Sequence, residues 1–279
     1  TGLADWVSGS VDIKKLISKD STHISAEYAT EYLFFKETPN SIWNNVDFRL
    51  ALLEAIPWDK LRENTFVKAT TLVYPLNGYP AVEGFSYTDK IEAKKMMDAA
   101  RQKFSINQDQ IIPITFAITD SEYMQKKATL LKDAWQDLGV ELSIITVNSY
   151  EYLHKIQEIN ADLFSYTWIG DFADPLAFLE LFRSNSTLNV TNWKNSEFDK
   201  LLDEAALYSD ENHSKILAQA EQLLLNQGLI IPIQHPVSLN IIDLNSIGGW
   251  SVNSFDIHPL KYLFKKEQKI NLPNVVLNY

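Results

Sequence analysis

The sequence predicts an α/β protein with a mixed, largely parallel sheet flanked by helices. Stretches typical of strands and of amphipathic helices alternate from residue 111 to residue 182, which is the order expected for βαβ units. Apolar residues make up 46% of the 279 residues and aromatic residues 12%, a globular composition. A chain of this length can bury a core that needs neither disulfides nor metal, and it contains no cysteine.

Charge and the missing cysteines disfavour several classes of protein. The formal net charge is −11, from 36 acidic and 25 basic residues, and such a field repels nucleic-acid backbones and anionic lipid headgroups. Without cysteine there is no thiolate catalysis and no Cys-ligated zinc. No apolar run approaches the roughly 20 residues that span a bilayer. We recognise no signal segment, and the opening residues resemble the interior of a domain more than a natural start.

The elements before residue 111 follow from aromatic content, apolar spacing and turn signals. Residues 28–36 are rich in aromatic side chains, as in a strand. Asp47 opens a helical pattern that Pro57 stops. Residues 70–87 contain several prolines and glycines and are expected to form an extended loop. A capping-box pattern at Asp89 then starts a second helix.

The alternating part of the chain supplies the predicted parallel strands. Apolar runs and period-two alternation predict three strands, over residues 111–118, 140–146 and 162–168. A helix over 122–138 has core residues at helical spacing, and Gly139 suits the position just after its end. A short helix around Tyr152 precedes the third strand.

After that strand, helical patterns dominate before the chain returns to strands. The expected elements are a helix from Pro175, a polar loop over 184–195, two helices around Leu201 and Leu217, strands over 230–234 and 239–242, and a final aromatic strand over 262–264.

The turn after the strand at 162–168 is the most informative stretch of the sequence. Gly170, Asp171, Asp174 and Pro175 follow the apolar run, the order of a strand, a sharp turn and a new helix. Ligands of open α/β sheets sit outside the carboxyl ends of strands, so Asp171 is placed to meet a cationic ligand. Alternatively, Asp171 caps the next helix. Asp174 before Pro175 is the residue we expect to cap it.

Four motifs follow one another along the chain: Asp47-Phe48-Arg49-Leu50-Ala51-Leu52, Trp135-x-x-Leu138-Gly139-Val140, Trp168-Ile169-Gly170-Asp171-Phe172-x-Asp174-Pro175, and Asn192-Trp193-x-Asn195 with its following helices. Their order resembles the C-terminal half of the extracytoplasmic oligopeptide- and dipeptide-binding proteins of ABC importers (solute-binding protein family 5). The resemblance implies a periplasmic-binding-protein-like (type II) lobe over residues 31–244. It also implies that residues 1–30 and 245–279 are crossover segments of another, mostly absent lobe.

The resemblance implies the residues that contact the ligand. In the family's oligopeptide binders, the acid matching Asp171 receives the α-ammonium of the bound peptide, and an ion removed from water needs such a partner. The full set expected at the ligand is Asp171, Trp168, Thr167, Ile169, Gly170, Ser165 and Phe172. Ser165 departs from the pattern because better-known members carry an arginine there.

The expected function is therefore capture of short peptides and their delivery to a membrane permease, outside the cytoplasm in the periplasm or lipid-anchored at the cell surface. We expect no nucleic-acid partner, cofactor, metal site or catalytic residue, since the five histidines are scattered and no glycine-rich phosphate loop occurs. Three alternatives stay open. They are a non-peptide solute (a nickel chelate, opine, haem or oligosaccharide), a peptide-sensing or chaperone-like surface protein without transport, and an enzyme that turns over its ligand.

Overall fold

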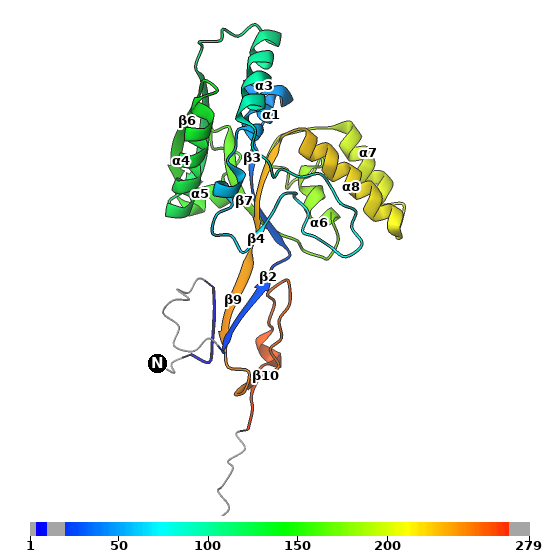
Figure 1. Ribbon diagram of the computed structural model, residues 1–279. Coiled ribbons are helices and arrows are strands. Elements are labelled where there is room, and N and C mark those ends of the chain that lie inside the picture. Colours follow the sequence, from blue (N-terminus) through cyan, green and yellow to red (C-terminus); the bar gives the residue numbers. More distant parts are fainter. Residues whose placement is uncertain (1–3, 10–19, 268–279) are drawn as a thin grey trace, which may run out of the picture. The chain divides into compact units, whose positions relative to one another are not determined.

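The computed structural model describes residues 4–9 and 20–267 (Figure 1). The chain divides into two compact units, a larger one, Tyr28–Pro236, and a smaller one that combines Thr1–Glu27 with Val237–Tyr279. The larger unit begins at Tyr28 and ends at Pro236, whereas the lobe expected from the sequence spans residues 31–244. Each unit is described separately.

The larger unit is built on a six-stranded mixed sheet with the order β4-β8-β3-β7-β5-β6. Its strands are β3 (Ala29–Phe35), β4 (Val67–Lys68), β5 (Ile112–Thr119), β6 (Val140–Val147), β7 (Leu163–Ile169) and β8 (Ile230–His235). The pairs β7–β5 and β5–β6 are parallel, whereas β4–β8, β8–β3 and β3–β7 are antiparallel.

The predicted α/β class and mixed sheet are confirmed, but the sheet is less parallel than predicted. The alternation of strands and helices covers only β5, β6 and β7, which are the parallel strands. β3 and β8 come from outside that stretch: β3 pairs with β7 and β8 pairs with β3, both in antiparallel register. Local alternation sets the direction of neighbouring strands only where a crossover helix joins them.

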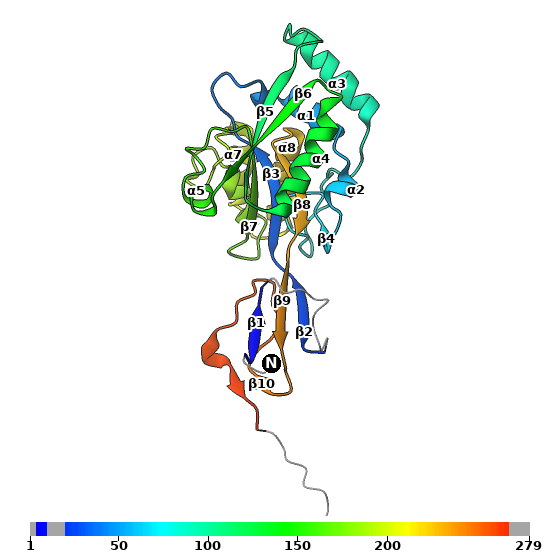
Figure 2. The same ribbon diagram turned by 90° about the vertical axis from the view of Figure 1, so that its left-hand side faces the viewer.

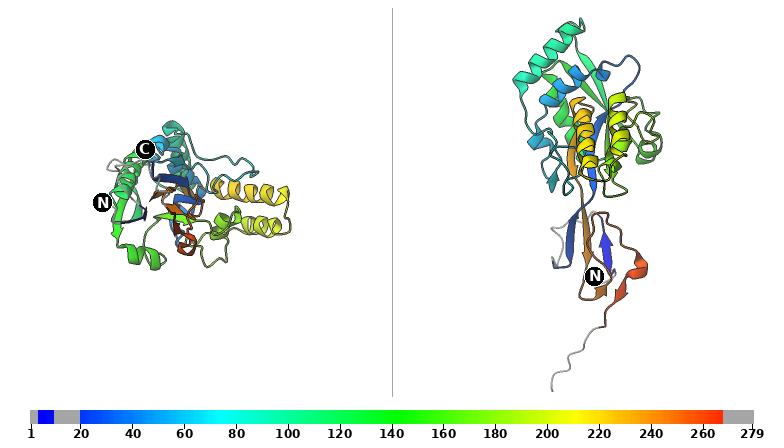
Figure 3. Two further views of the ribbon diagram at one scale, coloured as in Figure 1. Left: turned by 90° about the horizontal axis from the view of Figure 1, so that it is seen from below. Right: turned by 90° about the vertical axis from the view of Figure 1, so that its right-hand side faces the viewer.

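Helices cover both sides of this sheet. They are α1 (Val46–Glu54), α2 (Trp58–Leu61), α3 (Lys90–Lys103), α4 (Glu122–Gln136), α5 (Ser149–His154), α6 (Leu176–Leu179), α7 (Ser196–Ala205) and α8 (Glu211–Asn226). Figures 2 and 3 show α4 on one side and the α7–α8 pair on the other. Side chains cap several of them as sequence signals indicate, for example Asp89 at α3, and Gly139 has the positive φ of +70° expected after α4.

Aromatic side chains form much of the core between these layers. Phe34 on β3 stacks on Phe164 on β7, with ring centroids 5.4 Å apart, and both are fully buried. Trp135 of α4 is also fully buried and donates from Nε1 to Leu52 O at 2.9 Å, which joins α4 to α1. Burial of such rings is the main stabilising term, and the indole finds the polar partner that burial requires.

The predicted loop over 70–87 lies against α8 and is called the strap below. Glu221 of α8 accepts hydrogen bonds from Val73 N (2.7 Å) and Tyr79 Oη (2.9 Å), and Gln222 accepts one from Glu83 N (2.8 Å). The strap therefore has a fixed course although it contains no helix or strand.

The smaller unit contains the antiparallel sheet β1-β9-β2 and a two-stranded ladder, β10 with β11. The strands are β1 (Trp6–Ser8), β2 (Thr22–Ala26), β9 (Val237–Ile242), β10 (Ile247–Gly248) and β11 (Phe264–Lys265). The strand predicted over 262–264 is wrong in position, because Leu260–Tyr262 form a 3₁₀ turn and β11 begins at Phe264. Within the described ranges, no helix is long and apolar enough to cross a membrane.

Candidate functional site

The candidate site is built on β7 and the turn that follows it. β7 pairs with β3 along its whole length, from Leu163 opposite Phe35 to Ile169 opposite Ala29. On its other side it pairs with β5 only at Leu163 and Phe164. The second half of β7 therefore has a strand neighbour on one side and none on the other among the described residues.

Hydrogen-bond alternation shows which main-chain groups this leaves open. Gly170 N donates to Tyr28 O at 2.8 Å, so every second residue before it turns its N–H and C=O toward β3. Ser165, Thr167 and Ile169 turn theirs away from β3. Thus the N–H and C=O groups of Thr167 and Ile169, which we call the open edge, have no strand partner within the described residues.

Tyr152 of α5 marks the beginning of the open edge. Its hydroxyl accepts from Ser165 N at 2.7 Å and lies 2.9 Å from Ser165 O and 3.1 Å from Ala117 O. The phenol thus satisfies Ser165 at the point where β5 and β7 separate. Sequence reasoning placed a helix around Tyr152 but gave the side chain no role, because apolar spacing does not reveal a hydroxyl aimed at a strand.

Gly170 follows the strand at a position where neighbouring rings leave no space for a Cβ atom. A Cβ atom on Gly170 would lie 2.4 Å from the ring of Tyr28 and 3.3 Å from that of Phe178. The two rings pack edge to face with centroids 5.0 Å apart. They hold the turn against the sheet, and Asp171 follows immediately at the surface.

Asp171 and Asp174 have different environments in this turn. The carboxylate of Asp171 is exposed and forms no hydrogen bond or ion pair with any described residue. Asp174 Oδ1 accepts from Leu176 N at 2.8 Å, at the first residue of α6. The N-cap residue of α6 is Pro175 and not Asp174 as predicted, but Asp174 bonds the first N–H of the helix from the position before it, and Asp171 does not.

His213 near the start of α8 holds Asp174 in place. Its Nε2 lies 2.9 Å from Asp174 Oδ2, and its Nδ1 lies 2.9 Å from Ala205 O. Both partners are acceptors, so the ring donates both bonds only in its doubly protonated form. The bond to Ala205 O and the bond to Asp174 raise the pKa of His213 above its usual range against the opposing effect of burial.

The structure distributes the predicted site residues over two faces of β7. Ser165, Thr167 and Ile169 point to the face covered by α4, where Ser165 Oγ lies 3.7 Å from Met124 Sδ. Trp168 points to the opposite face, where its Nε1 donates to Ala177 O of α6 at 2.8 Å. Phe172 is half exposed in the turn, at 49%. A ligand lying along the open edge would therefore have the side chains of both faces of β7 beside it.

A polar cluster on the α4 face was missed by sequence reasoning. Glu31 on β3 stands opposite both Thr167 on β7 and Gln234 on β8. Its carboxylate accepts from Tyr123 Oη of α4 at 2.9 Å and from Gln234 Nε2. A charged residue inside an aromatic strand was the available signal, because a carboxylate there must be paired or serve a function.

Two positions near the candidate site carry no positive charge that could hold a ligand carboxylate. The first is Ser165, where better-known family members carry an arginine. His235, which follows Gln234, is buried and hydrogen-bonded through Nδ1 to Ala29 O at 3.0 Å. Burial lowers the pKa of His235 to about 4, so the ring is neutral near pH 7 and supplies no positive charge.

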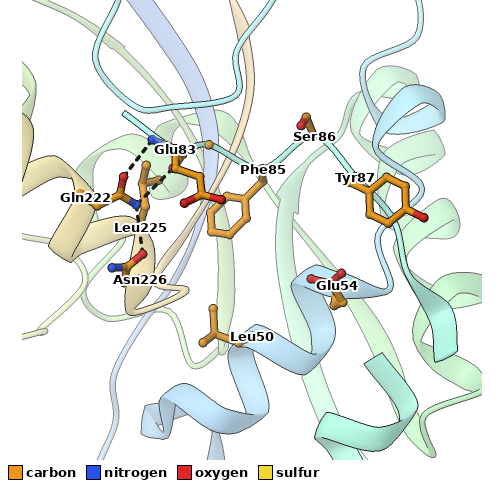
Figure 4. Close-up of a pocket in the computed structure, with 10 residues that line it drawn as sticks. Leu50, Glu54, Glu83, Phe85, Ser86, Tyr87, Gln222, Leu225 and Asn226 are labelled. Carbon is orange, nitrogen blue, oxygen red and sulfur yellow. Dashed lines mark hydrogen bonds between the residues drawn. The ribbon is translucent and has the colours of Figure 1, made fainter. Parts of the chain in front are cut away.

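One pocket lies apart from these residues. It has a volume of about 460 Å³ and is bounded by α1, α8 and the strap (Figure 4). Gln222 crosses its rim and bonds to both Glu83 and Asn226. None of the predicted site residues lines this pocket.

Comparison with known proteins shows which family this chain is similar to. The family described as "Bacterial extracellular solute-binding proteins, family 5 Middle" matches residues 2–189. The oligopeptide-binding protein OppA of Bacillus subtilis is 26% identical over 248 residues, 83% of this chain and 46% of that protein. The probable deoxycholate-binding periplasmic protein YgiS of Escherichia coli is 27% identical over 256 residues, 88% of this chain and 45% of its own.

Solved structures agree on the fold. The murein tripeptide binding protein MppA of Escherichia coli superposes with a TM-score of 0.76 at 21% identity, covering 88% of this chain and 50% of MppA. The chain thus spans about half the length of the relatives it matches.

Proposed function

Because the chain belongs to the bacterial extracellular solute-binding proteins of family 5, we propose that it is the ligand-gripping part of a protein that captures short peptides and delivers them to the membrane permease of an ABC importer. Capture of the peptide takes place outside the cytoplasmic membrane, in the periplasm or at the cell surface. OppA of Bacillus subtilis, a related protein, is named for oligopeptide binding, which supports the ligand class.

The open edge of β7 is the observation that carries the proposal. Extended peptides bind to a sheet edge by adding a strand, with main-chain bonds supplying affinity and alternate side chains entering separate sites. The N–H and C=O groups of Thr167 and Ile169 offer such an edge. Asp171 lies beyond its end with an exposed, unpaired carboxylate within the described part of the chain. That arrangement suits an extended ligand with a positive amino end.

A non-peptide solute is the second candidate. YgiS is named as a probable deoxycholate-binding protein and covers 88% of this chain. Neutral Ser165 and neutral His235 favour this candidate, because they offer a free peptide carboxylate no counter-charge. Asp171 and the open edge favour the peptide. A peptide-sensing surface protein without transport would use the same site and differs only in its partner.

We further propose that residues 31–244 act as the lobe that holds the amino end of the ligand. The segments 1–30 and 245–279 would contribute to a second lobe. Closure of two lobes around a bound solute is a common hinge motion. The length of the relatives, about twice that of this chain, supports this division.

Replacement of Asp171 by asparagine tests the assignment. In the complete protein, Asp171→Asn should weaken binding of an unmodified short peptide by about a hundredfold, because a buried ammonium loses its counter-charge. Calorimetry should show equally weak binding of the N-acetylated peptide to both proteins. Asp133→Asn, which changes an exposed acid of α4, serves as the control. Equal affinity of wild type and Asp171→Asn for the unmodified peptide would refute the role of Asp171.

A further inference from the structure

Three side chains form one row across the α4 face of the sheet. Gln234 on β8, Glu31 on β3 and Thr167 on β7 are register partners, so all three point to the same side. Figure 2 shows these strands side by side, with α4 running along them. Thr167 is exposed and belongs to the open edge, so the row ends where the ligand strand would begin.

Glu31 in the middle of the row is an incompletely satisfied carboxylate. Its side chain is only 6% exposed. Oε2 accepts from Tyr123 Oη and from Gln234 Nε2, and Gln234 Nε2 also lies 3.0 Å from Tyr123 Oη. Oε1 is buried and has no hydrogen-bond partner among the described residues. A buried acceptor without a donor is costly unless the site gains one when a ligand binds.

Lys127, a cation that interacts electrostatically with Glu31, does not supply that donor. Lys127 of α4 lies over the ring of Tyr123, 4.5 Å from its centroid, and its Nζ donates to Leu61 O. No described residue forms an ion pair with Glu31 within 4.0 Å. Burial lowers the pKa of Lys127, Glu31 raises it, and Arg62 lowers it. Lys127 thus offsets part of the charge of Glu31 but leaves Oε1 unbonded.

Geometry decides which ligand group could reach Glu31. Neighbouring strands lie about 4.8 Å apart, so a ligand strand on the open edge would lie roughly 10 Å from β3. Thr167, the residue of β7 between them, is short and exposed. A side chain crossing that distance must be long, and only lysine and arginine combine that length with N–H donors and a positive charge.

We propose that Glu31, framed by Tyr123 and Gln234, is a specificity-determining subsite for a lysine or arginine side chain of the bound peptide. The subsite rests on the proposed function. It is distinct from Asp171, which lies four residues beyond Thr167, or roughly 13 Å along an extended chain. The two carboxylates therefore bind different parts of one ligand. Asp171 binds its amino end, and Glu31 binds an internal basic side chain.

A lysine scan through an alanine peptide tests this subsite. Calorimetry on the complete protein should find one internal position where lysine binds roughly tenfold or more tightly than norleucine, which keeps the four-carbon chain but lacks the ammonium group, the effect of one charged hydrogen bond. Glu31→Gln should remove that preference, so that lysine and norleucine bind equally well at that position. Glu122→Gln, a neighbouring exposed acid on α4, is the matched control and should keep the preference.

The outcomes separate this inference from the proposed function. If no peptide binds to the wild type, both fail. If the all-alanine peptide binds but lysine never exceeds norleucine at any position, or the preference persists in Glu31→Gln, only the subsite is overturned. Should Glu31→Gln not fold, Tyr123→Phe decides, because loss of its hydroxyl should reduce the preference and an unchanged preference would contradict the subsite.

Discussion

Two aspartates in the turn after β7 have different contacts, which leaves Asp171 available for the ligand contact proposed above. Asp174 is bound by Leu176 N and His213, and its C=O accepts from Tyr28 Oη at 2.8 Å. Gly170 is fixed by the rings of Tyr28 and Phe178. With both flanking positions held, Asp171 needs little reorganisation to receive a ligand, which reduces the entropic cost of binding.

The pH dependence of this turn should reveal His213. Its pKa is raised in the folded state, so the stabilisation is fully present below its unfolded pKa near 6.5 and is lost as pH rises through the folded value. Relative to His213→Gln, the wild type should be more stable at pH 5.5 by about 1 kcal/mol, and this difference should shrink by pH 8.5. Urea unfolding at both pH values measures it.

His154→Gln is the matched control, since His154 is exposed on α5 and forms no ion pair within the described ranges. The control should follow the wild type at both pH values. If His213→Gln loses the same amount of stability at pH 5.5 and pH 8.5, the doubly protonated ring is not what holds Asp174.

At the scale of elements, β7 and the strap depend on side chains of neighbouring helices. Tyr152 of α5 satisfies Ser165 at the start of the open edge, and Trp168 is bonded to α6. Glu221 of α8 fixes the strap while being fully buried. Burial raises the pKa of Glu221 to about 7 despite the bonds from Val73 and Tyr79.

Because the pKa of Glu221 is raised, ionisation of this residue as the pH rises should lower the free energy of unfolding. A carboxyl group whose pKa is higher in the folded state than in the unfolded state favours folding less once it ionises, so stability should fall between about pH 4.5 and pH 7. The loss should be at most roughly 3 kcal/mol in the wild type, and Glu221→Gln should lack it. Chemical unfolding at pH 5 and pH 8 compares the two, with the exposed Glu83→Gln as control. A Glu221→Gln variant that loses as much stability as the wild type would contradict this account.

Sequence patterns predicted the helices and strands well, but they did not predict how side chains divide between the two faces of a strand. Apolar spacing found the strand that became β7 and the turn after it, because both are local features. The family resemblance grouped Thr167, Trp168 and Ile169 as neighbours of one ligand, and strand geometry adds that Trp168 lies on the face opposite the other two. Glu31, Tyr123 and Gln234 come from three distant segments, so only the folded chain brings them together.

At the scale of the whole molecule, the proposed function depends on a change of partner along one strand of the sheet. β7 is parallel to β5 for two residue pairs and then continues with β3 alone. The prediction of a largely parallel sheet missed this, because β3 and β8 join from outside the alternating stretch. The α/β class, the mixed sheet and the family were nevertheless predicted from the order of motifs.

The central claim is that a bound peptide adds a strand to the open edge of β7, and amide hydrogen exchange at single residues tests it most directly. In the complete protein, saturation with a short peptide should strongly slow exchange at Thr167 N–H and Ile169 N–H. Exchange at Trp168 N–H, already bonded toward β3, should change much less. Unchanged exchange at Thr167 and Ile169 in the presence of bound peptide would contradict the account.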